Sequence, residues 1–200
     1  MARTDSVFAT QIYHAQLSAR LNGELERACL VLAHDDRAGQ RWSKAHGYRG
    51  YTSYASLNDL PERMPEFAAL AKLIDRHVAA FTKALDFDMG GRRLKLDSLW
   101  ANVMPGGGVH GGHIHPHSAI SGTYYVAVPR GASAIKFEDP RLPLMMAAPM
   151  RKANAKAANR TFVSVEPKAG SLLLWESWLR HEVPLNLAKG QRISISFNYS

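Results

Sequence analysis

Residues 191–200 read QRISISFNYS, a stretch in which apolar and polar side chains alternate strictly. One set comprises Ile193, Ile195, Phe197 and Tyr199, and the other comprises Arg192, Ser194, Ser196 and Asn198. Successive side chains of a β-strand point to opposite faces, so the alternation predicts a strand with one apolar and one polar face. The interior of a barrel is where such a polar face is accommodated.

Six stretches upstream also have the composition of short strands, bounded mostly by glycine, proline or asparagine. They are LKLDSLWANVM (94–104), AISGTYYVAVP (119–129), AIKFED (134–139), TFVSVEP (161–167), GSLLLWE (170–176) and HEVPLN (181–186). Strands of this length and spacing favour an antiparallel sandwich or barrel. We therefore expect a mainly β core over residues 92–200.

The first part of the chain has a helical pattern instead. Residues 16–33 carry apolar side chains at helical spacing, and a second helix is expected to begin at Pro65, because proline suits a first turn. Residues 47–57, GYRGYTSYASL, have no period and are expected to form a loop. We thus predict a single domain over residues 1–200, in which a helical flank (1–91) packs on one sheet of the β core.

The formal net charge of +8 raises the question of a nucleic-acid partner. The basic residues are scattered, and their densest patch, RKANAKAANR (151–160), contains no aromatic side chain that could stack on bases. The charge therefore indicates a preference for anionic ligands, and nucleic acid is not the expected partner.

Cysteine content and hydropathy bear on the compartment. The chain has one cysteine, Cys29, which excludes an intramolecular disulfide and fits a reducing environment. No apolar run resembles the core of a signal peptide or reaches the ~18–20 residues of a membrane span. We expect a cytoplasmic protein without a membrane anchor.

Residues 140–160 lack the strand-like composition of the neighbouring segments and contain three prolines, three methionines and five basic residues. A loop of this length in a compact domain is usually a functional lid or a disordered segment, and the sequence leaves both open. The final strand and the aromatic segment 47–57 offer surfaces for a homodimer.

Residues 110–117 read HGGHIHPH, and their spacing suits metal binding. If HIH is a strand, His113 and His115 point to the same side, with the glycines forming a turn before it and Pro116 ending it. A third ligand is available from His181, in the strand HEVPLN. Three histidines with open positions would make a reactive site, since a structural metal site is usually closed by four ligands. His110 and His117 are expected in supporting roles.

Arg192 and Ser194 lie two residues apart on the polar face of the closing strand. A guanidinium with a hydroxyl at this spacing can clamp a carboxylate through charge-assisted hydrogen bonds. An isolated pair of this kind usually faces solvent, but here it follows His181 by one hairpin. The clamp is therefore the favoured interpretation.

The order of these parts resembles the Fe(II)- and 2-oxoglutarate-dependent oxygenases. The similarity covers residues 94–200 and rests on LWANVMPGGGVHGGHIH, SGTYYVAVP, GSLLLWESWLRHEVPLN and RISISFNY, which match a bacterial branch with an HxHPxSxxSGxYYV element. The resemblance implies a double-stranded β-helix, or jelly roll, with flanking helices. It also implies iron(II), 2-oxoglutarate and O₂ as cofactor and cosubstrates, and hydroxylation of a small molecule or peptide.

Residue by residue, the resemblance assigns His113 and His181 to the two histidines of the iron site. It assigns Arg192 and Ser194 to the far carboxylate of 2-oxoglutarate. Tyr124 or Tyr125 would add a hydroxyl toward the cosubstrate, and strand alternation allows only one of them to face inward.

The sequence departs from the family at His115, where most relatives have a carboxylate. A three-histidine set would contribute no negative charge, which favours binding of the 2-oxoglutarate dianion and makes higher oxidation states of iron less accessible. Two alternatives stay open. Glu138 or Asp139 would complete the set from a neighbouring strand, or His115 would not bind at all.

Two other functions would explain some of the same residues. A three-histidine dioxygenase of the cupin type, which uses no 2-oxoglutarate, would explain the histidines but leave Arg192 without a role. A zinc-binding β-sandwich without catalytic activity would explain the histidines alone. The identity of the substrate is left open by the sequence.

Overall fold

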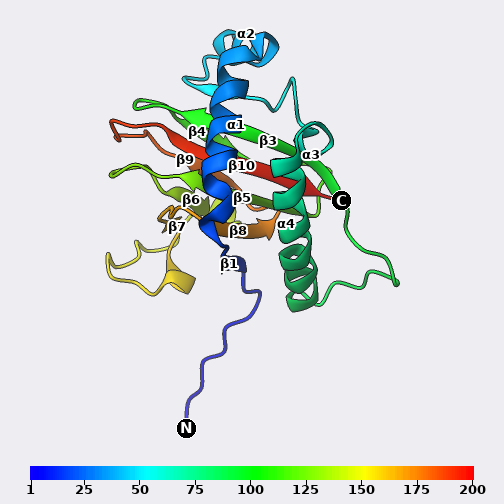
Figure 1. Ribbon diagram of the computed structural model, residues 1–200. Coiled ribbons are helices and arrows are strands. Elements are labelled where there is room, and N and C mark those ends of the chain that lie inside the picture. The colour runs from blue at the N-terminus through cyan, green and yellow to red at the C-terminus, as the bar shows by residue number, and fades with distance from the viewer.

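The computed structural model describes residues 1–200, in which ten strands form two facing antiparallel sheets (Figure 1). The six-stranded sheet has the order β1 (Ile12–Gln16), β8 (Ser171–Glu176), β5 (Ile120–Ala127), β10 (Arg192–Tyr199), β3 (Leu96–Met104) and β2 (Tyr51–Thr52). The four-stranded sheet has the order β4 (His110–His113), β9 (His181–Val183), β6 (Ile135–Glu138) and β7 (Phe162–Val165).

The chain crosses repeatedly between the two sheets. Along the sequence, β3, β5, β8 and β10 belong to the large sheet, whereas β4, β6, β7 and β9 belong to the small one. This alternation winds the eight core strands into the predicted double-stranded β-helix. As a result, β4 and β9 lie side by side although about seventy residues separate them along the chain.

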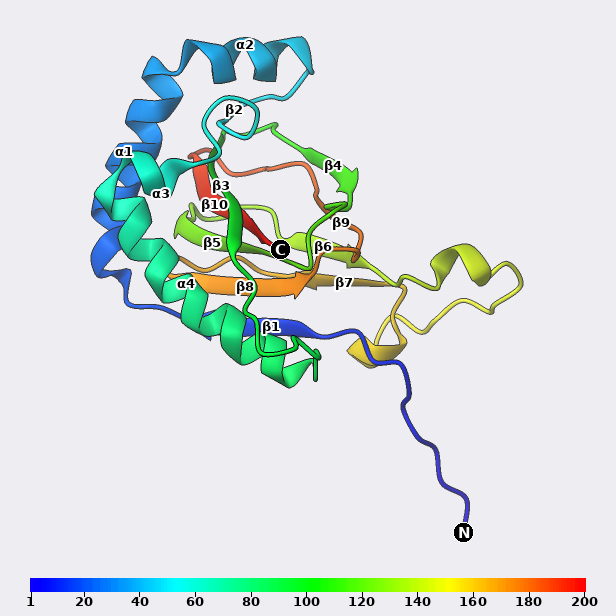
Figure 2. The same cartoon turned by 90° about the vertical axis from the view of Figure 1, so that its right-hand side faces the viewer.

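Helices cover the outer face of the large sheet (Figure 2). They are α1 (Asn22–Asp35), α3 (Leu60–Arg63) and α4 (Pro65–Ala84), whereas α2 (Arg37–Ala45) lies beside β2 at the edge of the sheet. A cluster of 23 buried apolar residues joins α1, α3 and α4 to the sheet, including Leu25 of α1, Phe67 of α4 and Ile195 of β10. The apolar face of β10 therefore turns outward to the helices, and its polar face turns inward between the sheets.

The predicted first helix begins later than expected. Residues 12–16 form β1, which pairs with β8 from Ile12 opposite Trp175 to Gln16 opposite Ser171. Helix α1 starts only at Asn22, whose amide donates to the carbonyl of Val126 at 2.9 Å. The helical apolar spacing extends upstream of this point, which is why periodicity alone placed the start too early.

Two further sequence predictions need correction. The predicted loop 47–57 contains β2, a two-residue strand that pairs with Val103 and Asn102 of β3. The predicted strand HIH is also wrong, because β4 ends at His113. The two glycines lie inside β4, where the pairing register with β9 shifts, and His115 belongs to the following segment.

Gly122 occupies a position in β5 that admits no side chain. A Cβ atom there would lie 2.4 Å from the ring of Phe197, its cross-strand partner, and 2.6 Å from the carbonyl oxygen of Leu173. We expect Gly122→Ala to lower the free energy of unfolding by about 2 kcal/mol or more, measured by urea denaturation. Gly23→Ala is the control, because its Cβ would meet nothing closer than 3.7 Å in helix α1. Equal stability of the two variants would contradict this packing account.

No helix has both the length and the apolar character needed to cross a membrane.

Candidate metal centre

Three histidines meet between the two sheets. His113 ends β4 and pairs in register with His181, which begins β9. His115 follows two residues after β4, where its backbone N–H donates to the carbonyl of Ser177 at 3.0 Å. One ring nitrogen from each of the three histidines lies within 4.8 Å of the others.

The other ring nitrogen of each histidine has its own acceptor. Nδ1 of His113 lies 2.7 Å from the carbonyl oxygen of Gly111, and Nδ1 of His181 lies 2.9 Å from that of Leu179. Nδ1 of His115 lies 2.6 Å from Oδ1 of Asn198. An acceptor oxygen fixes the proton on Nδ1, so all three Nε2 atoms keep free lone pairs.

These lone pairs fit a metal cation. Nε2 of His113 and Nε2 of His115 lie 3.1 Å apart, and neither carries a proton to share. Two nitrogens bound about 2.1 Å from one metal lie about 3.0 Å apart at an octahedral angle and about 3.4 Å apart at a tetrahedral one. A bound cation would turn the repulsion between the lone pairs into two coordinate bonds.

Burial keeps the cluster uncharged before any metal binds. Desolvation lowers the pKa of His181 to about 3, and it lowers the pKa values of His113 and His115 as well. The neighbouring imidazoles act in the same direction on His181, because two protonated rings at this distance would repel each other. Neutral imidazole is the form that binds metals, so protons do not compete for these sites at neutral pH.

Neither acidic alternative lies in the cluster. Glu138 faces Arg180, with the carboxylate and guanidinium 3.4 Å apart. Asp139 pairs with Arg141 at 2.8 Å. The three histidines form the only group of metal-ligating side chains that converges in the structure, and neither acid belongs to it.

Arg192 lies in the same cavity as the histidines and is 3% exposed. Its Nη1 donates to Oγ of Ser194 at 3.3 Å, and its Nε has no hydrogen-bond partner. No carboxylate forms an ion pair with it, although other arginines of the chain have such partners. A buried cation without a counter-ion is costly, so this guanidinium is arranged to receive an anion.

The two adjacent tyrosines of β5 have opposite surroundings. Tyr124 faces the helices, where its hydroxyl donates to Oδ1 of Asn22, so it does not line the cavity. Tyr125 faces inward, and the guanidinium carbon of Arg192 lies 4.9 Å from its ring centre. Its buried hydroxyl makes no hydrogen bond. Burial raises the pKa of Tyr125 against the opposing effect of Arg192, so the hydroxyl stays protonated and can donate to an anion.

The two tyrosines provide a matched pair of variants. We expect Tyr125→Phe to weaken binding of a dicarboxylate beside Arg192 by about tenfold, because a hydrogen bond to a charged group contributes about 1.5 kcal/mol or more. Tyr124→Phe should lower the free energy of unfolding by about 1 kcal/mol without changing dicarboxylate affinity. Isothermal titration calorimetry and urea denaturation measure the two quantities. The inward assignment of Tyr125 fails if Tyr124→Phe is the variant that weakens binding.

Some residues of the cavity were not predicted to belong to it. Tyr48 comes from the segment before β2, which the sequence marks only as an aromatic loop, and its buried hydroxyl has no hydrogen-bond partner. Its ring meets that of His110 edge-on, with 5.5 Å between ring centres. His110 in turn stacks on His113 at 4.6 Å. His110 thus supports a candidate ligand from the side, as expected, while Tyr48 brings an unpaired buried hydroxyl to the cavity.

The tryptophans near His181 differ in role. Trp175 is buried and meets His181 edge-on, with 4.7 Å between ring centres, so it packs the wall behind the histidine. Trp178 is 46% exposed and donates to Glu176 at the surface. No residue of the segment 140–160 lines the histidine cavity.

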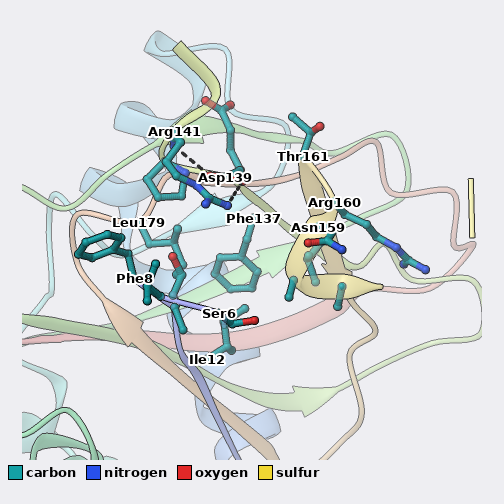
Figure 3. A pocket seen from close by; sticks show the side chains of 18 of the residues that line it. Ser6, Phe8, Ile12, Phe137, Asp139, Arg141, Asn159, Arg160, Thr161 and Leu179 are labelled. Carbon is teal, nitrogen blue, oxygen red and sulfur yellow. Dashed lines mark hydrogen bonds and ion pairs between the residues drawn. The ribbon is translucent and has the colours of Figure 1, made fainter. Parts of the chain in front are cut away.

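A larger cavity, of about 550 Å³, lies elsewhere (Figure 3). Its walls come from the N-terminal segment, from residues 137–141 and from residues 157–161, and its floor includes Phe137 and Leu179. The charged pair that Figure 3 shows at its rim, Asp139 and Arg141, is already neutralised. This cavity contains no converging histidines and no unpaired buried cation, so it is not the candidate metal centre.

Comparison with protein families gives one match. The family described as "Putative 2OG-Fe(II) oxygenase" matches residues 98–198, half of the chain. That range begins in β3 and ends in β10, and it includes all three histidines and Arg192. No curated protein sequence shows significant similarity to the chain.

Solved structures with the same fold extend the comparison to nearly the whole chain. A prolyl-4-hydroxylase from Pseudomonas putida has a TM-score of 0.58 at 16% identity, over 95% of this chain and 92% of that one. HygX from Streptomyces hygroscopicus, with nickel and 2-oxoglutarate bound, has a TM-score of 0.59 at 17% identity, over 96% and 82%.

A 2OG-Fe(II) oxygenase-family oxidoreductase from Burkholderia pseudomallei has a TM-score of 0.51 at 16% identity, over 69% of this chain. The alignment spans 59% of that protein, which is less than two thirds of its length. At these identities the three structures establish a shared fold.

Proposed function

Since the chain belongs to the 2OG-Fe(II) oxygenase family, we propose that His113, His115 and His181 bind iron(II) through their Nε2 atoms. We propose further that Arg192 binds the far carboxylate of 2-oxoglutarate. One observation carries both proposals. Three imidazoles with free lone pairs share a cavity with a buried arginine that has no counter-ion, so the cavity has a cation site and an anion site side by side.

The charge of the site suits this pair of ligands. Three neutral imidazoles contribute no charge, and Arg192 contributes +1. A divalent iron therefore keeps its full charge toward the 2-oxoglutarate dianion. Since opposite charges attract more strongly in a site shielded from water, both ligands should bind more tightly together than separately.

Side chains around the far carboxylate hold it in one orientation. Arg192 offers the charge, while the hydroxyls of Ser194 and Tyr125 are placed to donate to a bound oxygen. Apolar side chains of Met104 and Ile135 line the same cavity and exclude water. When bound, iron(II) with 2-oxoglutarate and O₂ supplies the oxidation, in which 2-oxoglutarate is split into succinate and CO₂ and an oxygen atom passes to the substrate.

The proposed reaction is hydroxylation of a small molecule or a peptide. Similar structures include a prolyl-4-hydroxylase and HygX with hygromycin B bound, and they share this fold. The cupin-type alternative, which uses no 2-oxoglutarate, is disfavoured by Arg192, because an oxygenase of that kind has no use for a buried guanidinium beside its metal.

Uncoupled turnover tests this function without knowledge of the substrate. With ascorbate as the two-electron reductant for the oxygen atom that no substrate accepts, we expect the iron(II)-loaded protein in air to convert 2-oxoglutarate slowly into succinate. The uptake of O₂ should depend on 2-oxoglutarate, and NMR and an oxygen electrode detect the two changes. The zinc-loaded protein is the control and should form no succinate, because zinc has no accessible redox change. Uptake of O₂ that does not depend on 2-oxoglutarate would favour the cupin-type alternative instead.

A further inference from the structure

A buried polar network lies behind His115. Oδ1 of Asn198 accepts from Nδ1 of His115 at 2.6 Å and from the hydroxyl of Ser121 at 2.8 Å. Ser121 also lies 2.7 Å from the hydroxyl of Ser177. On the other side, Nδ2 of Asn198 donates to the hydroxyl oxygen of Ser98 at 3.3 Å. Asn198 is 7% exposed, and both Ser121 and Ser177 are fully buried.

The hydrogen atoms of this network fix the orientation of Asn198. The Ser177 hydroxyl donates to Ser121, and Ser121 donates to Oδ1 of Asn198. The amide nitrogen is turned toward Ser98, which accepts from it. With Oδ1 facing His115, the Nδ1 hydrogen of His115 and the hydroxyl hydrogen of Ser121 both have an acceptor, and this arrangement holds the imidazole proton on Nδ1.

We infer that Asn198 is a positioning residue, which holds His115 in the tautomer whose Nε2 is free to bind a metal. This inference rests on the proposed function only in treating His115 as a ligand. In many proteins a carboxylate orients a metal-binding histidine, and here a neutral amide does so. Both His115 and its orienting residue are therefore uncharged, so the full charge of the metal reaches its other ligands.

Two substitutions of Asn198 have effects that separate orientation from packing. Asn198→Leu removes the nearer acceptor and leaves only the hydroxyl of Ser121, 3.1 Å from Nδ1, so the imidazole proton can move to Nε2. Asn198→Asp keeps an acceptor at the same place and adds a negative charge, and the hydroxyl of Ser98 can turn to donate to its second oxygen. Both variants should unfold at a lower temperature without metal, because one loses a buried hydrogen bond and the other buries a charge.

Their metal affinities should move in opposite directions. Loss of an orienting partner typically weakens metal binding by about 10–100-fold, so we expect this fall in zinc affinity for Asn198→Leu. Asn198→Asp should bind zinc more tightly than the parent despite its lower stability, because the added charge strengthens the His115 donor. If Asn198 only stabilised the fold, its two substitutions could not change zinc affinity in opposite directions. Competition with a chromophoric chelator measures the zinc affinities.

Nitrogen-15 NMR of the metal-free protein gives a readout independent of metal binding. His115 should carry its proton on Nδ1 in the parent and in Asn198→Asp, and it should populate the Nε2–H form in Asn198→Leu. Asn186→Leu is the control, since this other buried asparagine holds the carbonyls of Met104 and Pro105 and does not contact His115. It should lower stability and leave the tautomer of His115 unchanged.

The outcomes separate this inference from the proposed function. An unchanged tautomer in Asn198→Leu, or equal losses of zinc affinity in both Asn198 variants, would overturn the positioning role. If the tautomer shifts as expected but the parent protein binds neither zinc nor iron(II), the positioning role stands and the proposed metal centre fails.

Discussion

Replacement of Arg192 by methionine is expected to weaken binding of 2-oxoglutarate to the iron(II)-loaded protein by about two to three orders of magnitude. The guanidinium is buried between the sheets without a carboxylate partner, so the bound dianion would be its only counter-ion. Loss of one member of a buried charge pair typically costs about 3–5 kcal/mol. Anaerobic calorimetry measures the loss, and iron affinity should be nearly unchanged.

The same variant should be more stable than the parent when no ligand is present. In the free protein Arg192 is a desolvated charge without a partner, and methionine keeps the apolar stem while removing that charge. We expect the free energy of unfolding to rise by about 1 kcal/mol or more. A substitution that only disturbed the fold would not raise the free energy of unfolding while weakening the binding of 2-oxoglutarate.

Arg192→Lys is the control for charge alone. Lysine keeps the positive charge but cannot form two parallel hydrogen bonds to a carboxylate, so its affinity should lie between those of the parent and Arg192→Met. If Arg192→Met binds 2-oxoglutarate as the parent does, Arg192 is not part of the anion site.

Replacement of His181 by alanine is expected to abolish stable metal binding. Nε2 of His181 is one of only three converging donor atoms, and its ring is oriented by the carbonyl of Leu179. Loss of an orienting group alone costs about 10–100-fold in affinity, so loss of a ligand should cost more than about a hundredfold. Competition with a chelator under anaerobic conditions measures iron(II) affinity.

His110→Ala provides a matched control in the same cavity. His110 is also buried, and burial and the neighbouring imidazoles lower its pKa to about 4, but it stacks on His113 outside the converging group. We expect its loss to change iron affinity by less than about tenfold. Comparable losses in His110→Ala and His181→Ala would show that the assumed ligand set is incomplete.

The sheet architecture could be predicted because its strands are locally distinct. The alternation of residues 191–200 identified both faces of β10 correctly, and the short strands ended at glycine, proline or asparagine. Helix boundaries were less predictable. Periodicity does not distinguish a residue that packs against a helix from one that lies inside it, so β1 and the late start of α1 were missed.

Site residues on regular strands were easier to predict than residues whose position depends on a local irregularity of the backbone. Arg192 and Ser194 followed from alternation, and the inward tyrosine could be narrowed to two candidates. The convergence of His113 and His115 was expected for the wrong reason. A register shift within β4 and the contact of His115 with Ser177 bring their rings together, not a shared strand face.

Contacts between distant segments left no signal in the sequence. Tyr48 reaches the cavity from the helical flank, and Asn198 meets His115 only because β10 and the segment after β4 face each other across the sandwich. The contacts of both residues depend on how the two sheets pack against each other, and a local sequence pattern carries no information about that packing. Asn198 did lie on the predicted polar face, so its burial could be anticipated although its partner could not.

We propose that one cavity holds iron on three histidines and 2-oxoglutarate on Arg192. Anaerobic addition of 2-oxoglutarate to the iron(II)-loaded protein tests it most directly, because chelation of iron by the cosubstrate produces a visible charge-transfer band. We predict that the parent develops this band, that His181→Ala does not, and that Arg192→Met develops it only at far higher 2-oxoglutarate concentrations. Absence of the band from the parent protein, together with tight retention of zinc, would show that the cavity does not bind iron(II) and 2-oxoglutarate together.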